Sequence, residues 1–216
     1  MALVLFDLDN TLLTGDSVEA WTEYIKEQGL VGKEFFTKKI QFDKDYRLGR
    51  FDSLAYSIFL LEPLAGKKMQ EVDNLAKPFA LKVVEKFSDS LTQRLIQDHY
   101  SDECLLVSAT LSFIVREISS LLGLKTFFGT DAEVKDGVYT GALKGIPNFS
   151  EEKVRRVREW TLLKGISAED KVYAYSDSIY DLPMLEFADY PIVVDPDDKL
   201  KKISEERGWK MIDRTT

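Results

Sequence analysis

Multiple cysteines, long apolar runs and an excess of positive charge are all missing from this chain of 216 residues. The single cysteine, Cys104, excludes an intrachain disulfide and a zinc site built from several cysteines. No run approaches the roughly 20 apolar residues of a membrane-spanning helix. The N-terminus has no basic segment followed by a long apolar core, the pattern of a secretion signal. We therefore expect a cytoplasmic protein that does not act at a membrane.

The missing positive charge limits the class of partner. A formal net charge of -8 argues against nucleic acid or an anionic membrane as the general partner. A small phosphorylated metabolite is still compatible, because a metal ion and one lysine can reverse the field locally. Apolar residues make up 44% of the chain, which suffices for a packed core. The sequence favours a globular protein with a small-molecule partner, as a monomer or a homodimer.

A short apolar run ending in two carboxylates is the most informative feature present. Residues 2–6 fit a strand buried on both faces of a parallel sheet, and Asp7 and Asp9 follow directly. Ligands of open α/β sheets bind just outside the carboxyl ends of such strands. Two carboxylates on the same side of an extended chain repel each other unless a cation lies between them. The pattern favours Mg²⁺, although a solvated acidic turn is the alternative.

Apolar runs and helix-like patterns alternate along most of the remaining chain. This alternation predicts an α/β fold with a parallel sheet. Residues 112–122 predict a helix that ends at Gly123, and the dipeptide Asp136-Gly137 predicts a hairpin turn. The four further strand-like runs are residues 104–107, 126–128, 172–175 and 192–194.

Residues 15–84 interrupt the alternation. Their amphipathic patches predict helices, the last of them bent or divided at Pro78. A helical segment between the first two strands is expected to be an insertion at the mouth of the crevice, which we call the cap. The predicted division is a catalytic core of residues 1–14 and 85–216 with a cap of residues 15–84.

Three further segments carry polar residues near predicted strand ends or helix starts. Ser108 follows the second strand, where its hydroxyl would suit an anionic oxygen or cap a helix. Ser150 is the expected N-cap of a helix whose first turn holds Lys153, a cation that opposes the helix dipole. That lysine either meets a nearby negative group or lies on a solvated face. Asp177 ends a later strand, and Asp181 follows four residues on, facing back if the segment is helical.

These segments together resemble the four motifs of the haloacid dehalogenase-like (HAD) hydrolases. The text Phe6-Asp-Leu-Asp-Asn-Thr-Leu12 is similar to the first motif, D-x-D-x-[T/V], and the resemblance extends to about residue 194. It implies a Rossmann-like parallel-sheet core with helices on both faces and a small inserted α-helical cap. The position of the insertion is similar to that of the C1-cap branch, which includes phosphoserine phosphatases.

The resemblance also implies a mechanism, the Mg²⁺-dependent hydrolysis of a phosphate monoester. Asp7 would be the nucleophile that forms an aspartyl-phosphate, and Asp9 the general acid and base. The metal would be held by Asp7, the backbone carbonyl of Asp9, and Asp177. No step requires a histidine, and we expect His99, the only one, at the surface.

Four other residues receive roles by the same resemblance. Ser108 and Ala109 would bind the substrate's phosphate. Lys153 would bridge that phosphate and the nucleophile. Asp181 would orient either Lys153 or metal-bound water without binding the metal itself. A haloacid dehalogenase and a receiver-like signalling protein are the competing classes. The first needs no acid at Asp9, and the second has no cap.

The substrate is expected to be chosen by the cap. By resemblance, Asp16 would hold a substrate amine and Phe51 would line the pocket. The arginine that clamps a serine carboxylate should stand at Ile58, although Arg47 or Arg50 could take its place. An apolar residue cannot replace a bidentate guanidinium.

A missing clamp favours an amino alcohol phosphate over phosphoserine. Some proteobacterial chains similar to this one are histidinol-phosphatases, so histidinol phosphate is the favoured substrate and phosphoserine the alternative. Four aromatic residues could stack on an imidazole or pack inside the cap. They are Trp21, Tyr24, Phe51 and Tyr56.

Overall fold

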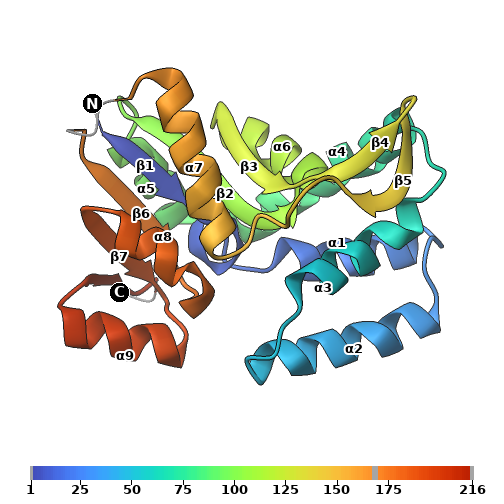
Figure 1. The fold of residues 1–216 in the computed structure, drawn as a ribbon, viewed down its shortest axis with the longest axis horizontal. Coiled ribbons are helices and arrows are strands. Elements are labelled where there is room, and N and C mark those ends of the chain that lie inside the picture. Colours follow the sequence, from blue (N-terminus) through green and yellow to red (C-terminus); the bar gives the residue numbers. More distant parts are fainter. Residues whose placement is uncertain (1, 167–169, 215–216) are drawn as a thin grey trace.

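The structure is a computed structural model that describes residues 2–166 and 170–214. Its centre is a six-stranded sheet of parallel strands in the order β3-β2-β1-β6-β7-β8 (Figure 1). β1 lies between β2 and β6, so the ends of these three strands meet at one edge of the sheet. The strands are β1 (Leu3–Phe6), β2 (Glu103–Leu111), β3 (Thr126–Thr130), β6 (Val172–Ser176), β7 (Tyr190–Val194) and β8 (Lys210–Ile212).

Helices cover both faces of this sheet. Side chains alternate along β1, so Leu3 and Leu5 face one layer of helices while Val4 and Phe6 face the other. One layer contains α7 (Glu151–Lys164), α8 (Leu182–Phe187) and α9 (Asp198–Arg207). The other contains α5 (Ser90–Asp98) and α6 (Ser112–Leu121). The predicted Rossmann-like α/β core is confirmed.

One strand extends well beyond its predicted range, and another was not predicted at all. β2 continues to Leu111, and its pairing with β3 shifts register between Val107 and Leu111. Ser108 therefore lies in an irregular stretch inside the strand rather than beyond its end. β8 was not predicted, because it is a three-residue edge strand without an apolar run.

The segment after β1 is helical, as predicted. It contains α1 (Ser17–Glu27), α2 (Lys33–Arg47), α3 (Ser53–Leu61), a short turn η2 (Glu62–Leu64) and α4 (Met69–Phe87). α4 runs through Pro78 as one helix, so it is not divided there. Because α4 packs on α6 of the core as well as on α1, the boundary proposed at residues 84 and 85 stays a prediction.

A β-hairpin from the second half of the chain supports the cap. It consists of β4 (Ala132–Lys135) and β5 (Val138–Leu143), joined at Asp136 and Gly137. Both turn residues have positive φ, 51° and 77°, as the predicted two-residue turn requires. The hairpin bonds to the start of α4, where the Met69 amide donates to the Gly137 carbonyl over 2.9 Å. Figure 1 shows it extending from the core toward the cap helices.

Two aromatic candidates for substrate stacking belong to the interior instead. Trp21 is fully buried, and its ring lies 5.0 Å from that of Phe79 and 5.5 Å from that of Phe113. Tyr24 packs against the same cluster. Packing, the alternative to substrate stacking, is thus confirmed for Trp21 and Tyr24, although Trp21 packs on Phe113 of the core as well as inside the cap.

His99 is buried, so the expectation of a surface residue is wrong. Its Nδ1 lies 3.0 Å from Asp102 Oδ2 and its Nε2 lies 2.8 Å from the Tyr175 hydroxyl. The ring also packs beside Phe6 and Tyr173. Asp102 in turn accepts a bond from the Ala2 amide, so this group fastens the start of β1. The sequence could not show that Tyr175, 76 positions away, faces His99.

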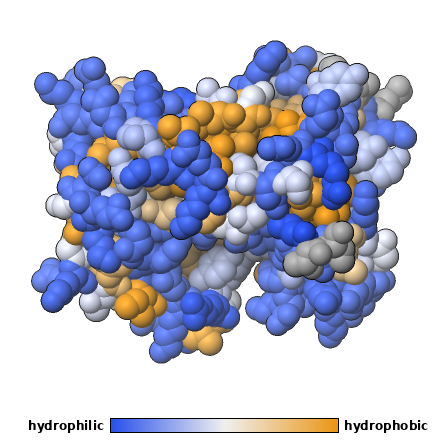
Figure 2. Space-filling view, turned by 180° about the vertical axis from the view of Figure 1, so that it is seen from behind, coloured by the Kyte–Doolittle hydropathy of each residue, from blue (hydrophilic) through white to orange (hydrophobic). Residues whose placement is uncertain are grey.

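Hydrophilic residues cover most of the rear face of the molecule, and a notch separates its two parts at the lower edge (Figure 2). An apolar area crosses the upper middle of this face. Within residues 2–166 and 170–214, no helix is long and apolar enough to cross a membrane.

Candidate active site

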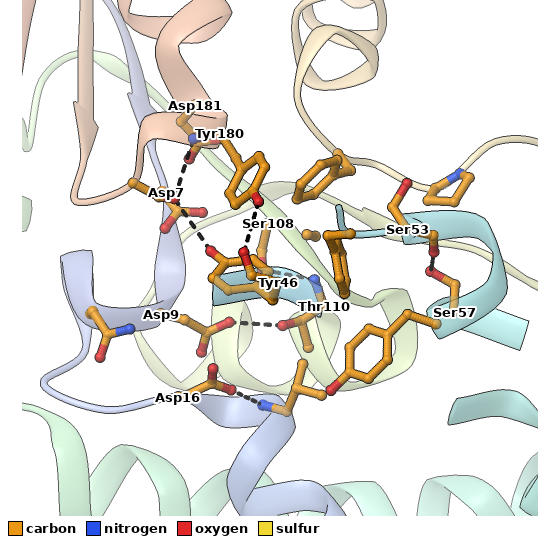
Figure 3. A pocket seen from close by; sticks show the side chains of 18 of the residues that line it. Asp7, Asp9, Asp16, Tyr46, Ser53, Ser57, Ser108, Thr110, Tyr180 and Asp181 are labelled. Atoms are coloured by element: carbon orange, nitrogen blue, oxygen red, sulfur yellow. Dashed lines mark hydrogen bonds between the residues drawn. The ribbon is translucent and has the colours of Figure 1, made fainter. Parts of the chain in front are cut away.

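A cavity of about 390 Å³ lies between the cap and the edge of the sheet where β1, β2 and β6 end. Figure 3 shows Asp7, Asp9 and Asp16 along one side of it, with Ser53 and Ser57 of α3 across from them. The structure brings every predicted site residue to this cavity. These are Asp7, Asp9, Asp16, Phe51, Ser108, Ala109, Lys153, Asp177 and Asp181.

The loop after β1 is compact and irregular. The Asp7 amide still bonds to the Tyr175 carbonyl of β6, which continues the sheet pairing up to the first carboxylate. The chain then turns through η1 (Leu8–Leu12), where Asn10 adopts φ 56°. Asparagine tolerates this left-handed conformation better than most residues. The turn keeps Asp7 and Asp9 beside the same cavity.

Lys153 joins two of the carboxylates. Its Nζ donates to Asp7 Oδ1 and to Asp181 Oδ2, each over 2.7 Å. Asp181 also accepts a bond from the Ser176 hydroxyl over 2.8 Å. Burial lowers the pKa of Lys153, but the charges of Asp181 and Asp7 outweigh this and raise its pKa above the ordinary value. The lysine meets negative groups inside the protein, so the solvated-face alternative is wrong.

Thr11 holds Asp7 and Asp177 close together. Its hydroxyl lies 3.3 Å from Asp7 Oδ2 and 3.0 Å from Asp177 Oδ1. Burial raises the pKa of Asp7 to about 6 despite the opposing charge of Lys153. Burial, followed by the charges of Asp7 and Asp181, raises the pKa of Asp177 to about 8. Without a cation, the two carboxyl groups resist being ionised together.

Asp9 points away from this pair and toward the start of α1. Its Oδ1 accepts a bond from the Ser17 amide over 2.6 Å, and its Oδ2 accepts one from the Thr110 hydroxyl over 2.8 Å. Burial and the charges of Asp16 and Asp7 raise the pKa of Asp9 to about 7. A carboxyl group with that pKa can give or take a proton near neutral pH.

The residues present fit a divalent cation with oxygen ligands. The described residues contain no group of three or more His, Cys, Asp or Glu side chains suited to hold a metal. The predicted set needs only two such side chains, Asp7 and Asp177, because the third ligand is the backbone carbonyl of Asp9. Lys153 alone cannot balance three carboxylates, Asp7, Asp177 and Asp181, and hard cations prefer all-oxygen ligands. Metal binding itself stays a prediction.

Asp16 has a structural partner that sequence reasoning missed. Its Oδ1 accepts bonds from the amides of Val18 and Glu19, both over 2.8 Å, and so caps the N-terminus of α1. An acidic residue just before a helical pattern is the signal that would have indicated the cap. The same side chain lines the cavity, so capping does not remove it from the pocket wall.

Hydrogen bonds from neighbouring segments hold the backbone around Ser108, the residue of the second motif. Ser108 is buried, and its Oγ accepts a bond from the Thr110 amide over 3.1 Å. Asn148 Nδ2 donates to the Ser108 carbonyl over 2.8 Å, and the Ala109 carbonyl accepts a bond from Thr130 Oγ1 over 2.7 Å. These bonds anchor the backbone on both sides of the Ser108 hydroxyl.

Ser150 precedes α7, as predicted, but its side chain does not cap that helix. The residue adopts φ 52°, and its hydroxyl makes no bond to the amides of the first turn. Serine at this position resembles an N-cap in the sequence, whereas the left-handed backbone differs from the extended conformation usual for one.

An aromatic wall joins the cap to the core at the pocket. The ring centroid of Tyr46 of α2 lies 4.8 Å from that of Tyr180, and the ring centroid of Phe149 lies 5.0 Å from that of Tyr180. Phe51 packs on Phe149 at 5.5 Å and on Tyr56 at 5.2 Å. The Tyr180 hydroxyl also donates to the Tyr46 carbonyl over 3.1 Å. Sequence reasoning identified Phe51 and Tyr56 but missed Tyr46 and Phe149, which carry no motif signal.

Of the positions considered for a carboxylate clamp, the cavity is lined by Arg47 and not by residue 58. On α3 the residues that line the cavity are Ser53, Tyr56, Ser57 and Leu60, which recur at the spacing of one helix face. Ile58 falls off that face and does not line the cavity. Arg47, the alternative position, lies at the end of α2 and does line it, and the missing clamp stays a prediction.

The fold and the site together define the class of protein. The sequence matches the family profile described as haloacid dehalogenase-like hydrolase over residues 4–186. This match covers most of the chain and includes all four motifs. The chain belongs to the haloacid dehalogenase-like hydrolases, and the predicted family is confirmed.

Three individual comparisons refine this placement. The chain is 35% identical to the histidinol-phosphatase of Neisseria meningitidis serogroup C, with 97% of each chain covered. It is 33% identical to a protein of unknown function from Bordetella pertussis Tohama I, with a TM-score of 0.90 and 98% of each chain covered. A phosphoserine phosphatase solved as a phospho-aspartyl intermediate analogue has a TM-score of 0.63 at 20% identity. The match covers 93% of this chain and 90% of the phosphatase chain. At 20% identity it shows that the two chains share a fold.

Proposed function

We propose that this protein hydrolyses phosphate monoesters of small metabolites through an aspartyl-phosphate on Asp7, with Mg²⁺ as cofactor. One observation carries the proposal. The Asp7 carboxylate bonds to a buried lysine, and a second carboxyl group with a pKa of about 7, Asp9, lies two residues away. Such a pair separates the role of nucleophile from the role of proton donor.

The residues have complementary tasks in the proposed reaction. Asp7, kept ionised by Lys153, attacks phosphorus while the bond to the leaving oxygen breaks. Asp9 donates its proton to that oxygen, then takes a proton from the water that hydrolyses the acyl phosphate. The Ser108 hydroxyl and the Lys153 ammonium offer hydrogen bonds to phosphoryl oxygens. Bound Mg²⁺ would supply charge neutralisation between the carboxylates and the phosphoryl group.

Asp9 also separates this proposal from the competing classes. A dehalogenase expels a halide, which needs no proton, so a protonatable Asp9 would have no task there. A receiver-like protein keeps its phosphoaspartate, whereas Asp9 supplies a base for removing it. The helical cap over the pocket likewise favours a metabolite-processing enzyme.

The favoured substrate is histidinol phosphate. The relative of 35% identity that spans nearly the whole chain carries that activity in its name. The cap side of the cavity has three carboxylates, Asp16, Glu19 and Asp43, which suit a substrate amine. Lys39 is buried between the last two and balances only part of this charge. The aromatic wall offers a surface for an imidazole. A cytoplasmic location, predicted from the sequence, belongs to the same proposal.

Arg47 is a feature of the pocket wall that favours phosphoserine. A guanidinium at the pocket wall is suited to bind a carboxylate, which histidinol phosphate lacks. Phosphoserine is therefore the second candidate.

Phosphate release by the purified protein tests both parts of the proposal. We expect turnover of a generic aryl phosphate in Mg²⁺ and its loss in a chelator. We also expect kcat/KM for histidinol phosphate to exceed that for phosphoserine by about tenfold, since an imperfectly clamped carboxylate is desolvated without full compensation. Full turnover in chelator contradicts the metal role. A higher kcat/KM for phosphoserine contradicts the preference for histidinol phosphate and shows that some cap residue binds the carboxylate.

A further inference from the structure

Arg214, near the end of the chain, connects three segments that are distant in the sequence. Its Nη1 donates to Asp89 Oδ2 over 2.7 Å, and its Nη2 donates to the backbone carbonyl of Thr11. Its Nε lies 3.4 Å from Asp195 Oδ2, and its backbone amide donates to Asp195 Oδ1 over 3.1 Å. The side chain is only 10% exposed. No sequence motif includes this residue.

Thr11 is what makes the Arg214 contact relevant to the site. Its carbonyl accepts the bond from Arg214, while its hydroxyl lies between Asp7 and Asp177. Thr11 has no exposed surface, so neither contact can be replaced easily by water. A single residue thus links the arginine, through its backbone, to both candidate metal-binding carboxylates, through its side chain.

The loop that contains Thr11 depends on such contacts. It is an irregular turn with a left-handed residue, Asn10, and cannot hold itself in place as a regular helix does. Thr92 Oγ1 donates to the neighbouring Leu12 carbonyl over 2.5 Å and accepts a bond from the amide of Asp89, the acceptor of Arg214, over 3.1 Å. Arg214 and Thr92 thus donate to two consecutive carbonyls of the loop, those of Thr11 and Leu12. Asp89 bonds to both donors and holds them together.

We propose that Arg214 is a positioning residue that sets the separation of Asp7 and Asp177 by fixing Thr11. Its loss lowers both the affinity for Mg²⁺ and kcat, without a direct contact to metal or substrate. A planar guanidinium can bond to several acceptors in different directions at once, which an ammonium on a flexible stem does less well. The proposal rests on the proposed function for the identity of the cation.

The test compares R214A and R214K with a matched control, R207A. Arg207 lies on α9, pairs with Glu186 at the surface and does not contact the loop. We expect R214A to weaken Mg²⁺ binding, measured by calorimetry without substrate, by about 10- to 100-fold, with a similar loss in kcat and an unchanged KM. R214K should lie between R214A and the wild type. R207A should match the wild type in both measurements.

A double-mutant cycle with T11V distinguishes positioning from general stabilisation. Valine resembles threonine in shape but lacks the hydroxyl between Asp7 and Asp177. If Arg214 acts through that hydroxyl, adding R214K to T11V changes Mg²⁺ affinity by less than about twofold. Additive effects overturn the proposal, as does a lower melting temperature with unchanged Mg²⁺ affinity. If R214A does not fold, R214K and its cycle decide.

These outcomes are separable from failure of the proposed function. Mg²⁺ binding is measured without a phosphate ester, so a wild-type protein that binds Mg²⁺ but hydrolyses none overturns the proposed reaction alone. A wild-type protein that binds no Mg²⁺ overturns the metal in the proposed function and, with it, the proposed effect of Arg214 on Mg²⁺ affinity. An R214K variant that binds Mg²⁺ as tightly as the wild type overturns only the role of Arg214.

Discussion

The core and the cap contribute to the same cavity in different ways. In the core, Lys153 and Asp181 are each 3% exposed and have two bonded partners. In the cap, Arg47 is exposed and Asp16 uses one oxygen to cap a helix while facing the cavity. The core holds its side chains in a fixed network, whereas the cap presents side chains that remain available. Chemistry common to many substrates belongs to the first kind of environment, and substrate choice to the second.

The largest effect is expected in the core, at the nucleophile. Asp7→Asn should lower kcat by at least about a thousandfold for every phosphate ester, because an amide cannot form the acyl phosphate. Lys153 keeps Asp181 as a partner, so the variant should remain folded by circular dichroism. Asp7→Glu is the matched control, because it keeps the negative charge but moves the carboxylate. It should be nearly as inactive as Asp7→Asn. Substantial turnover by Asp7→Asn would show that another group attacks phosphorus.

The next largest effect concerns proton transfer in the core. Asp9→Asn should lower kcat by about 10²- to 10⁴-fold for an alkyl phosphate, since the alkoxide then leaves without a proton. Phosphate ester turnover is measured with alkyl and aryl esters in parallel. Asp43→Asn, which changes a pocket carboxylate of the cap, should leave turnover of the aryl ester within about threefold. Equal losses at positions 9 and 43 would contradict a division between core chemistry and cap recognition.

A third prediction concerns pH and the metal. Because the raised pKa values of Asp7, Asp9 and Asp177 extend to about 8, the folded metal-free protein binds more protons than the unfolded chain from about pH 4 to 8. The stability that these groups contribute is therefore lost as pH rises through that window. Mg²⁺ must displace the protons, so its binding tightens over the same range.

Thermal unfolding with Mg²⁺ and with a chelator, from pH 5.5 to 8, checks this prediction. The increase in melting temperature caused by Mg²⁺ should grow with pH, and its affinity should rise by about 10- to 100-fold. If the increase in melting temperature caused by Mg²⁺ stays constant or falls with rising pH, these carboxylates are not the binding site.

The smallest effect is expected in the cap. Arg47→Ala should lower kcat/KM for phosphoserine by about threefold, the effect of a partly solvated charge contact. Histidinol phosphate and an aryl phosphate should change less, because neither has a carboxylate. Arg50→Ala is the matched control, since Arg50 pairs with Asp45 and does not line the cavity. An equal loss for all three substrates would instead give Arg47 a role at the phosphate.

The core was the easier region to predict for a physical reason. Buried parallel strands appear in the sequence as apolar runs, and their ends converge at one edge of the sheet. Asp7 and Asp177, each following such a strand, could therefore be expected to meet, whereas Lys153, at the start of a helix, was expected beside them only from the resemblance to the family's third motif. The partners that fix them, Thr11 and Arg214, lie 203 positions apart. No local pattern records a bond between such distant segments.

The cap was harder, because helical periodicity identifies an apolar face but not the neighbour it packs against. The sequence pattern allows Trp21 and Tyr24 to be interior or pocket residues, and in the structure side chains of α4 and α6 cover them. A shift of one position along α3 separates Ser57, which lines the cavity, from Ile58, which does not. Tyr46 and Arg47 lie at the end of α2, and only the docking of that end beside Tyr180 brings them to the site.

Trapping the covalent intermediate tests the central claim most directly. An aryl leaving group needs little protonation, so the Asp9→Asn variant should complete the first step with an aryl phosphate and stall at the second. The account predicts a burst of one phenol per enzyme and, after an acid quench, one phosphoryl group on the peptide that contains Asp7, located by mass spectrometry. A phosphoryl group on another residue, or release of phenol and phosphate in equal amounts from the first turnover with no labelled peptide, would contradict it.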